Sequence, residues 1–397
     1  MRTTCILVNV VILFSAGALV RAQGLALDLN AELTGALYGS SSPSGRKINS
    51  NFREDDPFNA LRGKLFPHVV IGRASGVEGE FLFDNKAVSF DHTRTQRLRL
   101  DGLYAFVHGL YEDRLNVWLG RIPTPVGTFS RRSYSHLNPL VGYPLAYHYK
   151  VPYDAFELSA QRKNLDLRDN GDGAATSIYE ACWITGLSLF GTVAGVDYLI
   201  AAGRGTLTNP EAAANHGFQI AGHVGRAVSS VVRIGASFGI APYLQYDRGL
   251  PSGVSVRDPK HRLYGFDVEC KLDAIHIYGE AIHNIWDTPQ YSTEKSISAF
   301  SWYVEGQYVF TSQIYAAARF DQMIFSHITD PEAGGRTPWG YNVGRIEAGM
   351  GFHASKHLIL KGVVQYNRID YPAARNITII ALQSALRIED MLSVGSP

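Results

Sequence analysis

Charged residues recur at every second position along several stretches of the C-terminal half of the chain. Arg319 and Asp321 are two residues apart, and so are Arg345 and Glu347. Side chains at alternate positions of a β-strand point to the same side, so each acid would project beside a base. Acids and bases on one face of a sheet can pair across neighbouring strands. The pattern therefore predicts a polar face held together by ion pairs.

The stretch from 122 to 152, IPTPVGTFSRRSYSHLNPLVGYPLAYHYKVP, gathers side chains that could bind or react. It contains two adjacent arginines and places His136 close to Ser133 and Ser135. Serine and histidine can form a nucleophilic pair, but closeness in sequence does not establish the necessary geometry. The chain has no H-E-x-x-H zinc motif, and its 13 histidines are scattered. We therefore predict no enzyme activity, no metal site and no cofactor.

The residues on either side of this stretch alternate between apolar and polar types. In FSWYVEGQYVF, which runs from Phe300 to Phe310, every second residue beginning with Phe300 is apolar or glycine. Similar alternation continues through 313–324, 342–354 and 357–369. Period two is the signature of a β-strand with two unlike faces. Many of these segments are about nine to twelve residues long, which suits a tilted strand that crosses a bilayer.

Connections between the predicted strands alternate between short and long. About seven short turns and about eight long connections would join about 16 strands, within a range of 14–18, and bacterial outer-membrane barrels have this organisation. We predict an all-β fold: a transmembrane antiparallel up-and-down β-barrel with short periplasmic turns and long extracellular loops. The parity of the strands places YDAFELSAQ, residues 153–161, inside the third long loop, which spans about 122–177.

The N-terminal residues 1–22 have the features of a secretory signal peptide. An early Arg2 precedes an apolar run from Ile6 to Val20, and Ala22 provides the small residue before the predicted cleavage site. The mature chain, 23–397, would then be a single barrel in the cell outer membrane. Its net charge of +1, counted with the signal peptide, gives no reason to expect a nucleic-acid partner.

Three stretches resemble Gram-negative outer-membrane porins, most closely the porin O and P-like (phosphate-selective porin-like) family: LNVWLGRIPTPVGTF, NPLVGYPLAYHY and RIEAGMGFHASKHLILKGVVQYNR. The resemblance implies a water-filled channel for passive diffusion of small hydrophilic solutes or ions, with a third loop folded inward, and a possible homotrimer. Outer-membrane lipid and lipopolysaccharide would be its other partners. An alternative is a barrel that acts as a scaffold, adhesin or sheath for a partner protein.

Two sets of site residues follow from this interpretation. If the apolar faces of the strands meet lipid, the opposite faces line the lumen. The lumen-lining candidates are Arg97, Arg99, Asp101, Arg121, Glu305, Arg319, Asp321, Arg345, Glu347 and Lys361, and Glu32, Glu80 and Glu280 share the predicted face. The pore-constriction candidates, all in the third long loop, are Arg131, Arg132, His136, Tyr143, Tyr147 and His148.

Overall fold

The computed structural model describes ten parts of the chain: residues 25–42, 60–84, 98–154, 174–178, 183–208, 217–244, 250–289, 295–329, 335–370 and 376–394. The predicted signal peptide and Arg97 lie outside these residues. No helix among the described residues is long and apolar enough to cross a membrane.

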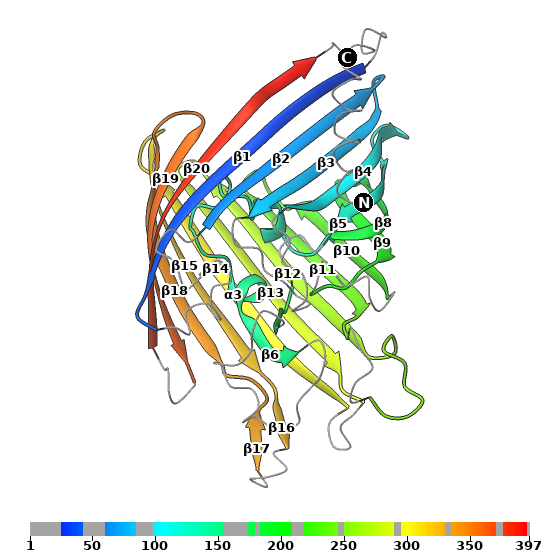
Figure 1. Ribbon diagram of the computed structural model, residues 1–397, viewed down its shortest axis with the longest axis vertical. Coiled ribbons are helices and arrows are strands. Elements are labelled where there is room, and N and C mark those ends of the chain that lie inside the picture. The colour runs from blue at the N-terminus through cyan, green and yellow to red at the C-terminus, as the bar shows by residue number, and fades with distance from the viewer. Residues whose placement is uncertain are drawn as a thin grey trace, which may run out of the picture.

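Sixteen strands form one closed antiparallel barrel, in which each strand pairs with its neighbours and β1 also pairs with β20 (Figure 1). The strands are β1 (Leu25–Ser40), β2 (Ala60–Ile71), β3 (Ser75–Asp84), β4 (Leu98–Leu110), β5 (Leu115–Pro123), β8 (Trp183–Val193), β9 (Val196–Arg204), β10 (Phe218–Ala227), β11 (Val232–Pro242), β12 (Lys260–Leu272), β13 (Ile275–Asp287), β14 (Ser296–Val309), β15 (Ile314–Phe325), β18 (Val343–His353), β19 (Leu358–Ile369) and β20 (Asn376–Val394). The predicted fold class is confirmed.

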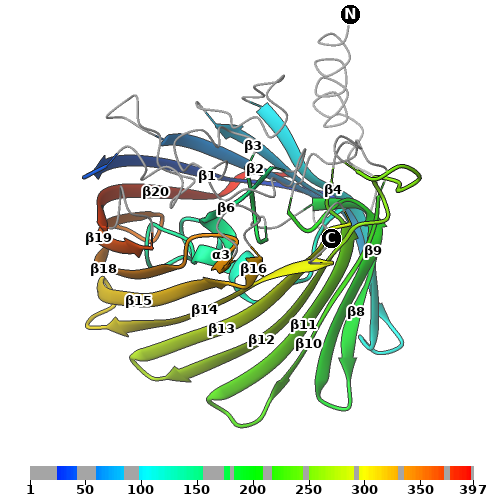
Figure 2. The ribbon, with the colours of Figure 1, turned by 90° about the horizontal axis from the view of Figure 1, so that it is seen from below.

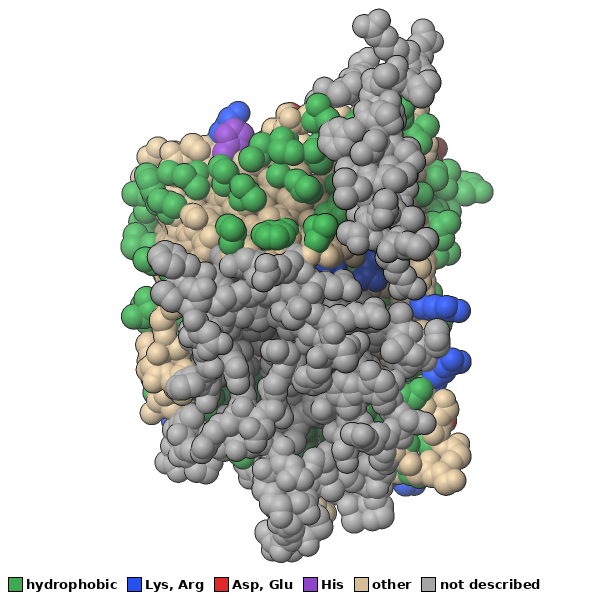
Figure 3. Space-filling view, in the orientation of Figure 1, with side chains coloured by type: hydrophobic (Ala, Val, Ile, Leu, Met, Phe, Trp, Pro, Cys, Tyr) green, Lys and Arg blue, Asp and Glu red, His purple; other side chains and the backbone are tan. Residues whose placement is uncertain are grey.

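Alternation along each strand separates an apolar outer wall from a polar inner wall. On β14, Phe300, Val304 and Tyr308 are 41%, 48% and 45% exposed, whereas Tyr303 and Glu305 are buried. Figure 3 shows hydrophobic side chains gathered on the outer wall around β1 and β2. Exposed apolar side chains on every strand suit contact with lipid, because a large apolar surface is unfavourable in water.

The short connections are tight turns. Between β8 and β9 the turn residues Ala194 and Gly195 have φ angles of 51° and 75°. Two consecutive residues with positive φ match the twist of the two strands that they join, and glycine adopts this conformation without steric cost. Such turns close the strands at one rim of the barrel.

The connection between β5 and β8 runs from 124 to 182, compared with the expected 122–177. It contains the 3-10 helix η2 (Phe129–Arg132), the helix α3 (Leu145–His148), β6 (Lys150–Asp154) and β7 (Ala174–Thr176). β6 pairs with β7 outside the barrel sheet, as the parity argument required for residues 153–154, and residues 155–161 of that stretch lie outside the described residues. Figure 2 shows α3 and β6 within the ring of strands. Residues 124–149 are called the inward loop below. A second small sheet, β16 (His327–Thr329) with β17 (Arg336–Pro338), lies between β15 and β18.

Candidate functional site

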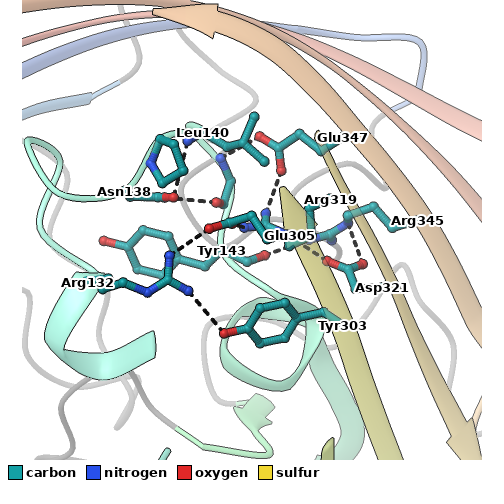
Figure 4. A network of polar contacts seen from close by, with 12 residues as sticks. Arg132, Asn138, Leu140, Tyr143, Tyr303, Glu305, Arg319, Asp321, Arg345 and Glu347 are labelled. Atoms are coloured by element: carbon teal, nitrogen blue, oxygen red, sulfur yellow. Dashed lines mark hydrogen bonds and ion pairs between the residues drawn. The ribbon is translucent and has the colours of Figure 1, made fainter. Parts of the chain in front are cut away.

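Arg132 connects the inward loop to the barrel wall (Figure 4). Its Nη1 is 2.6 Å from Glu305 Oε1, and its Nη2 donates to the Tyr303 hydroxyl at 3.2 Å. The guanidinium carbon also lies 3.7 Å from the centre of the Tyr278 ring, within the range of a cation–π contact. One loop side chain therefore contacts two neighbouring strands, β13 and β14.

An ion cluster of five residues lies on the wall behind Arg132. Arg319 is 3.0 Å from Glu305, 3.1 Å from Asp321 and 2.6 Å from Glu347, while Arg345 is 3.8 Å from Asp321. All five side chains are at most 1% exposed. Charges so far from water need close partners, because burial costs several kcal/mol for each unpaired ion. With Arg132 included, three acids balance three bases.

The wall also binds the backbone of the inward loop. The Gly142 amide donates to Glu347 at 2.7 Å, and Arg345 donates to the Tyr143 carbonyl at 2.8 Å. Lys361 donates to the carbonyls of Ser135, Asn138 and Leu140, at 2.7 Å for Asn138. A loop has no ladder partner for its buried backbone groups, so side chains from the wall must satisfy them. These contacts fix the course of the loop inside the barrel.

Glu280 on β13 forms a second anchor. It accepts a hydrogen bond from the Thr128 amide at 3.1 Å and another from the Tyr147 hydroxyl at 2.9 Å. Burial raises the pKa of Tyr147 well above its usual value, and the nearby Glu280 charge adds to this effect, so the hydroxyl stays protonated and donates. Gly127 has a φ of 62°, and a Cβ there would lie 1.6 Å from Glu280 Oε1. Only glycine fits this approach.

Further anchors come from the start of the barrel. Glu32 on β1 accepts hydrogen bonds from the amides of Ser135 and His136, each at 3.2 Å, and contacts the His136 ring. Tyr134 donates to Glu80 on β3 at 2.8 Å. The sequence places Glu32, Glu80 and Glu280 on the inner face, but it gives no sign that they bind the loop.

Apolar packing completes the attachment. Leu140, Leu145 and Tyr149 are fully buried in a cluster that includes Trp286 and Phe325 of the wall. Phe129 stands 5.1 Å from Tyr143, 5.0 Å from Tyr147 and 6.4 Å from Tyr303, measured between ring centres. Phe129 is itself fully buried, so the loop packs on the wall as a core does.

The constriction candidates are placed unequally. Arg131 is exposed, whereas Arg132, His136 and Tyr147 point to the wall, and Tyr143 donates to the Ser133 carbonyl within the loop. The His148 side chain lies outside the described residues. Among the five candidates whose side chains are described, the structure directs Arg131 away from the wall contacts, because most polar side chains of a loop inside a barrel are needed for its attachment.

The lumen-lining candidates require two corrections. Glu305, Arg319, Asp321, Arg345, Glu347 and Lys361 lie on the inner face, but they are at most 3% exposed, because the inward loop covers them. Arg121 is paired in register with Leu103 and Thr185, which are exposed on the outer wall, so it lies on the outer face. Arg99 and Asp101 form an ion pair with each other on β4.

The opposite side of the loop is open. A cavity of about 450 Å³ separates it from the wall. From the wall it is lined by Phe66, Glu78, Gly79, Glu80, Tyr104, Trp118, Trp183, Phe190 and Leu199, and from the end of β5 and the loop by Pro123, Thr124, Pro125, Val126, Gly127, Ser130, Arg131 and Tyr134. The inward loop thus fills one side of the barrel and leaves space beside β2–β5, β8 and β9.

Strands β10–β12 carry a serine, a histidine and an aspartate close together, and the serine lies in a G-x-S-x-G pattern that the sequence analysis did not identify. Residues 235–239 read GASFG, and Ser237 pairs in register with His223, which lies 2.9 Å from Asp267. A nucleophile elbow needs a sharp strand-to-helix turn, but this motif lies within strand β11. The Ser237 hydroxyl accepts the Gly127 amide at 2.9 Å, so it serves as another anchor of the loop.

A closed antiparallel barrel of sixteen strands, apolar outside and ionised inside, is the fold of outer-membrane porins. No protein-family model matches the chain, and no curated protein matches it in sequence. Solved structures do match. A loop L8 deletion mutant of OmpT, an outer membrane protein of Vibrio cholerae, is 11% identical, covers 92% of this chain and 100% of its own, and has a TM-score of 0.58.

Two other solved barrels are similar. The Salmonella typhi OmpF complex with daunomycin is 11% identical over 91% of this chain and 97% of its own, with a TM-score of 0.56. The outer membrane channel DcaP of Acinetobacter baumannii is 8% identical over 92% of this chain and 98% of its own, with a TM-score of 0.50. At this identity the similarity establishes the fold.

Proposed function

We propose that the chain is an outer-membrane channel through which small hydrophilic solutes or ions diffuse passively. The observation that carries the proposal is the one-sided filling of the barrel by the inward loop. On the filled side Glu305 on β14 and Lys361 on β19 are 0% and 3% exposed, whereas the Lys64 and Arg99 side chains on β2 and β4 are 16% and 15% exposed. A path along β2–β5, lined by aromatic rings and a few charged side chains, would let hydrated solutes pass beside the loop.

The attachment of the loop supports a fixed constriction. Its anchors come from β1, β3, β11, β13, β14, β18 and β19, so the loop is held across much of the barrel. A loop held by buried charges and packed rings keeps one position, as a size filter requires. Arg131, which is exposed and lines the same cavity as Glu78 and Glu80, would be the constriction residue that solutes meet.

Conductance in planar bilayers tests the proposal. Purified full-length protein should insert and carry steady single-channel currents. Removal of residues 129–149 should raise the conductance, because the loop occupies part of the cross-section. A folded, inserted protein that carries no current would refute the proposal. Unchanged conductance of the shortened protein would show that the loop does not narrow the path. Circular dichroism of both proteins would verify that the barrel is intact.

We also propose that the protein is exported by cleavage after residue 22, resides in the outer membrane and assembles as a homotrimer. The apolar outer wall supports a membrane location, and OmpT of Vibrio cholerae, which is similar in fold, has a solved trimer form. Membrane fractionation with N-terminal sequencing tests the first two statements. Chemical cross-linking of the detergent-solubilised protein tests the third, and a monomer alone would contradict it.

A further inference from the structure

The cavity beside the inward loop has an aromatic wall. The Tyr104 and Trp118 rings are 5.0 Å apart, and the Trp118 and Phe190 rings are 4.5 Å apart, measured between centres. These three residues come from β4, β5 and β8, so neighbouring strands present one continuous ring surface. Packed rings lose little conformational entropy on binding and offer faces on which a planar group can stack. We call this space, about 450 Å³ in volume, the aromatic chamber.

A second pair of rings faces the chamber from another side. Phe66 on β2 lies 5.8 Å from Tyr134 of the inward loop, in an edge-to-face arrangement. Tyr134 is fixed further by its hydrogen bond to Glu80 and by Lys64, whose Nζ lies 4.4 Å from the ring centre. Both sides of the chamber are therefore held in place before any solute arrives.

Two charged groups at the chamber lack an ion-pair partner among the described residues. Glu78 on β3 contacts the Tyr104 hydroxyl, and no base among the described residues is bonded to it. Arg131 of the inward loop is exposed and forms no hydrogen bond or ion pair in the described part of the chain, although it interacts electrostatically with Asp197 on β9. In contrast, Glu80 is satisfied by Lys64 and Tyr134, each at 2.8 Å. One acid on the wall and one base on the loop thus remain available to a ligand.

We propose that the aromatic chamber binds small zwitterionic solutes that carry an aromatic ring. The ring would stack on Trp118 and Tyr104, the ammonium group would pair with Glu78, and the carboxylate would pair with Arg131. The chamber volume lies within the roughly 300–1,000 Å³ of small-molecule sites, which typically combine apolar walls with a few polar groups. The inference deepens the proposed channel function by naming a class of solute for the same lumen.

Calorimetric titration of the detergent-solubilised full-length protein tests this class. The probes are phenylalanine, phenethylamine, phenylacetate and glycine, which separate the contributions of the ring, the amine and the carboxylate. Phenylalanine should bind most tightly, and loss of either charge or of the ring should weaken binding roughly tenfold or more, the usual effect of a lost charge-assisted hydrogen bond. Equal binding of phenylalanine and glycine, or of phenylalanine and phenylacetate, would overturn the proposal.

Variants of the chamber residues test which side chain binds each group of phenylalanine. Trp118→Ala should abolish phenylalanine binding, whereas Trp118→Phe keeps a ring and should retain it, which guards against misfolding as the cause of a loss. Glu78→Gln should remove the advantage of phenylalanine over phenylacetate. Arg114→Gln is the matched control, because the Arg114 side chain is 65% exposed at a turn, paired with Glu112. Normal phenylalanine binding by Trp118→Ala would overturn the proposal.

Calorimetry and conductance separate this inference from the proposed function. Calorimetry does not require that solutes pass through the barrel. A protein that conducts ions but binds none of the four probes would overturn the aromatic chamber as a binding site and leave the channel in place. A protein that binds phenylalanine but carries no current would support the chamber and refute the channel.

Discussion

Replacement of Arg132 by alanine should release the start of the inward loop without unfolding the barrel. The change removes the hydrogen bonds to Glu305 and Tyr303 and the cation–π contact with Tyr278. Glu305 keeps Arg319 as a partner at 3.0 Å through its other oxygen, so it stays paired, although the buried cluster then has three acids and two bases. The strand ladders are untouched, and the lost free energy should therefore come from loop attachment.

The size of the effect follows from these contacts. A hydrogen bond to a charged group contributes ~1.5–3 kcal/mol, and a desolvated cation–π contact contributes up to about 2 kcal/mol. The bond to Glu305 and the cation–π contact together contribute about 2–5 kcal/mol, which corresponds to a rise of roughly 30-fold to 5,000-fold in the population of the locally detached loop, and the bond to Tyr303 adds to this. The Arg132 side chain is 12% exposed, so water screens these contacts weakly.

Hydrogen exchange read by mass spectrometry measures this population. Peptides that cover 126–136 should exchange faster in Arg132→Ala by a factor within that range, while peptides from β10–β15 should be unchanged. Arg114→Ala is the control, because that exposed pair contributes little. Unchanged exchange of the loop would refute the attachment role of Arg132. Equal acceleration in the loop and the strands would show that the change weakens the barrel instead.

Two further predictions concern the loop anchor and the outer wall. Gly127→Ala should displace Glu280, because the added Cβ would lie 1.6 Å from Glu280 Oε1, and should raise single-channel conductance. Gly306→Ala, where nothing lies within 4 Å, is its control, and equal conductance of the two variants would contradict the anchor. Val364→Arg on the outer wall, where Val364 is 50% exposed, should lower the free energy of unfolding from bilayers by about 2–4 kcal/mol. Urea titration in lipid vesicles measures it, and a value like that of Val364→Leu would show that Val364 does not face lipid.

The strand pattern was readable because its cause is local. From Phe300 to Phe310, alternate residues face outward and inward as predicted, since successive side chains of a strand point to opposite sides. The expected count of about sixteen strands followed from the number of short turns and long connections that alternate along the chain. The same parity removed residues 153–154 from the barrel, and their pairing with β7 agrees.

For Arg121 the charge of the side chain and its position in the strand alternation indicate opposite faces of the barrel. Arg121 stands two residues after Leu119, which is 61% exposed on the outer wall, so its parity already indicated the outer face. Arg121 is among the lumen-lining candidates predicted from the sequence, whereas the strand register places it on the outer face. Its Nε donates to the Asp101 carbonyl at 2.8 Å, which provides a polar partner there.

The sequence by itself determined the barrel, which face of each strand is apolar and which is polar, and the identity of the longest loop. These features depend on residue order and on the period of the pattern. Only the tertiary structure decided that Glu305, Arg345 and Lys361 bind the inward loop instead of lining open water. Their partners, such as Arg132 and the Asn138 carbonyl, lie more than 170 residues away in sequence. A period-two pattern assigns each side chain to a face, but the side chains that cover that face are fixed by the path of a loop, and no local pattern encodes that path.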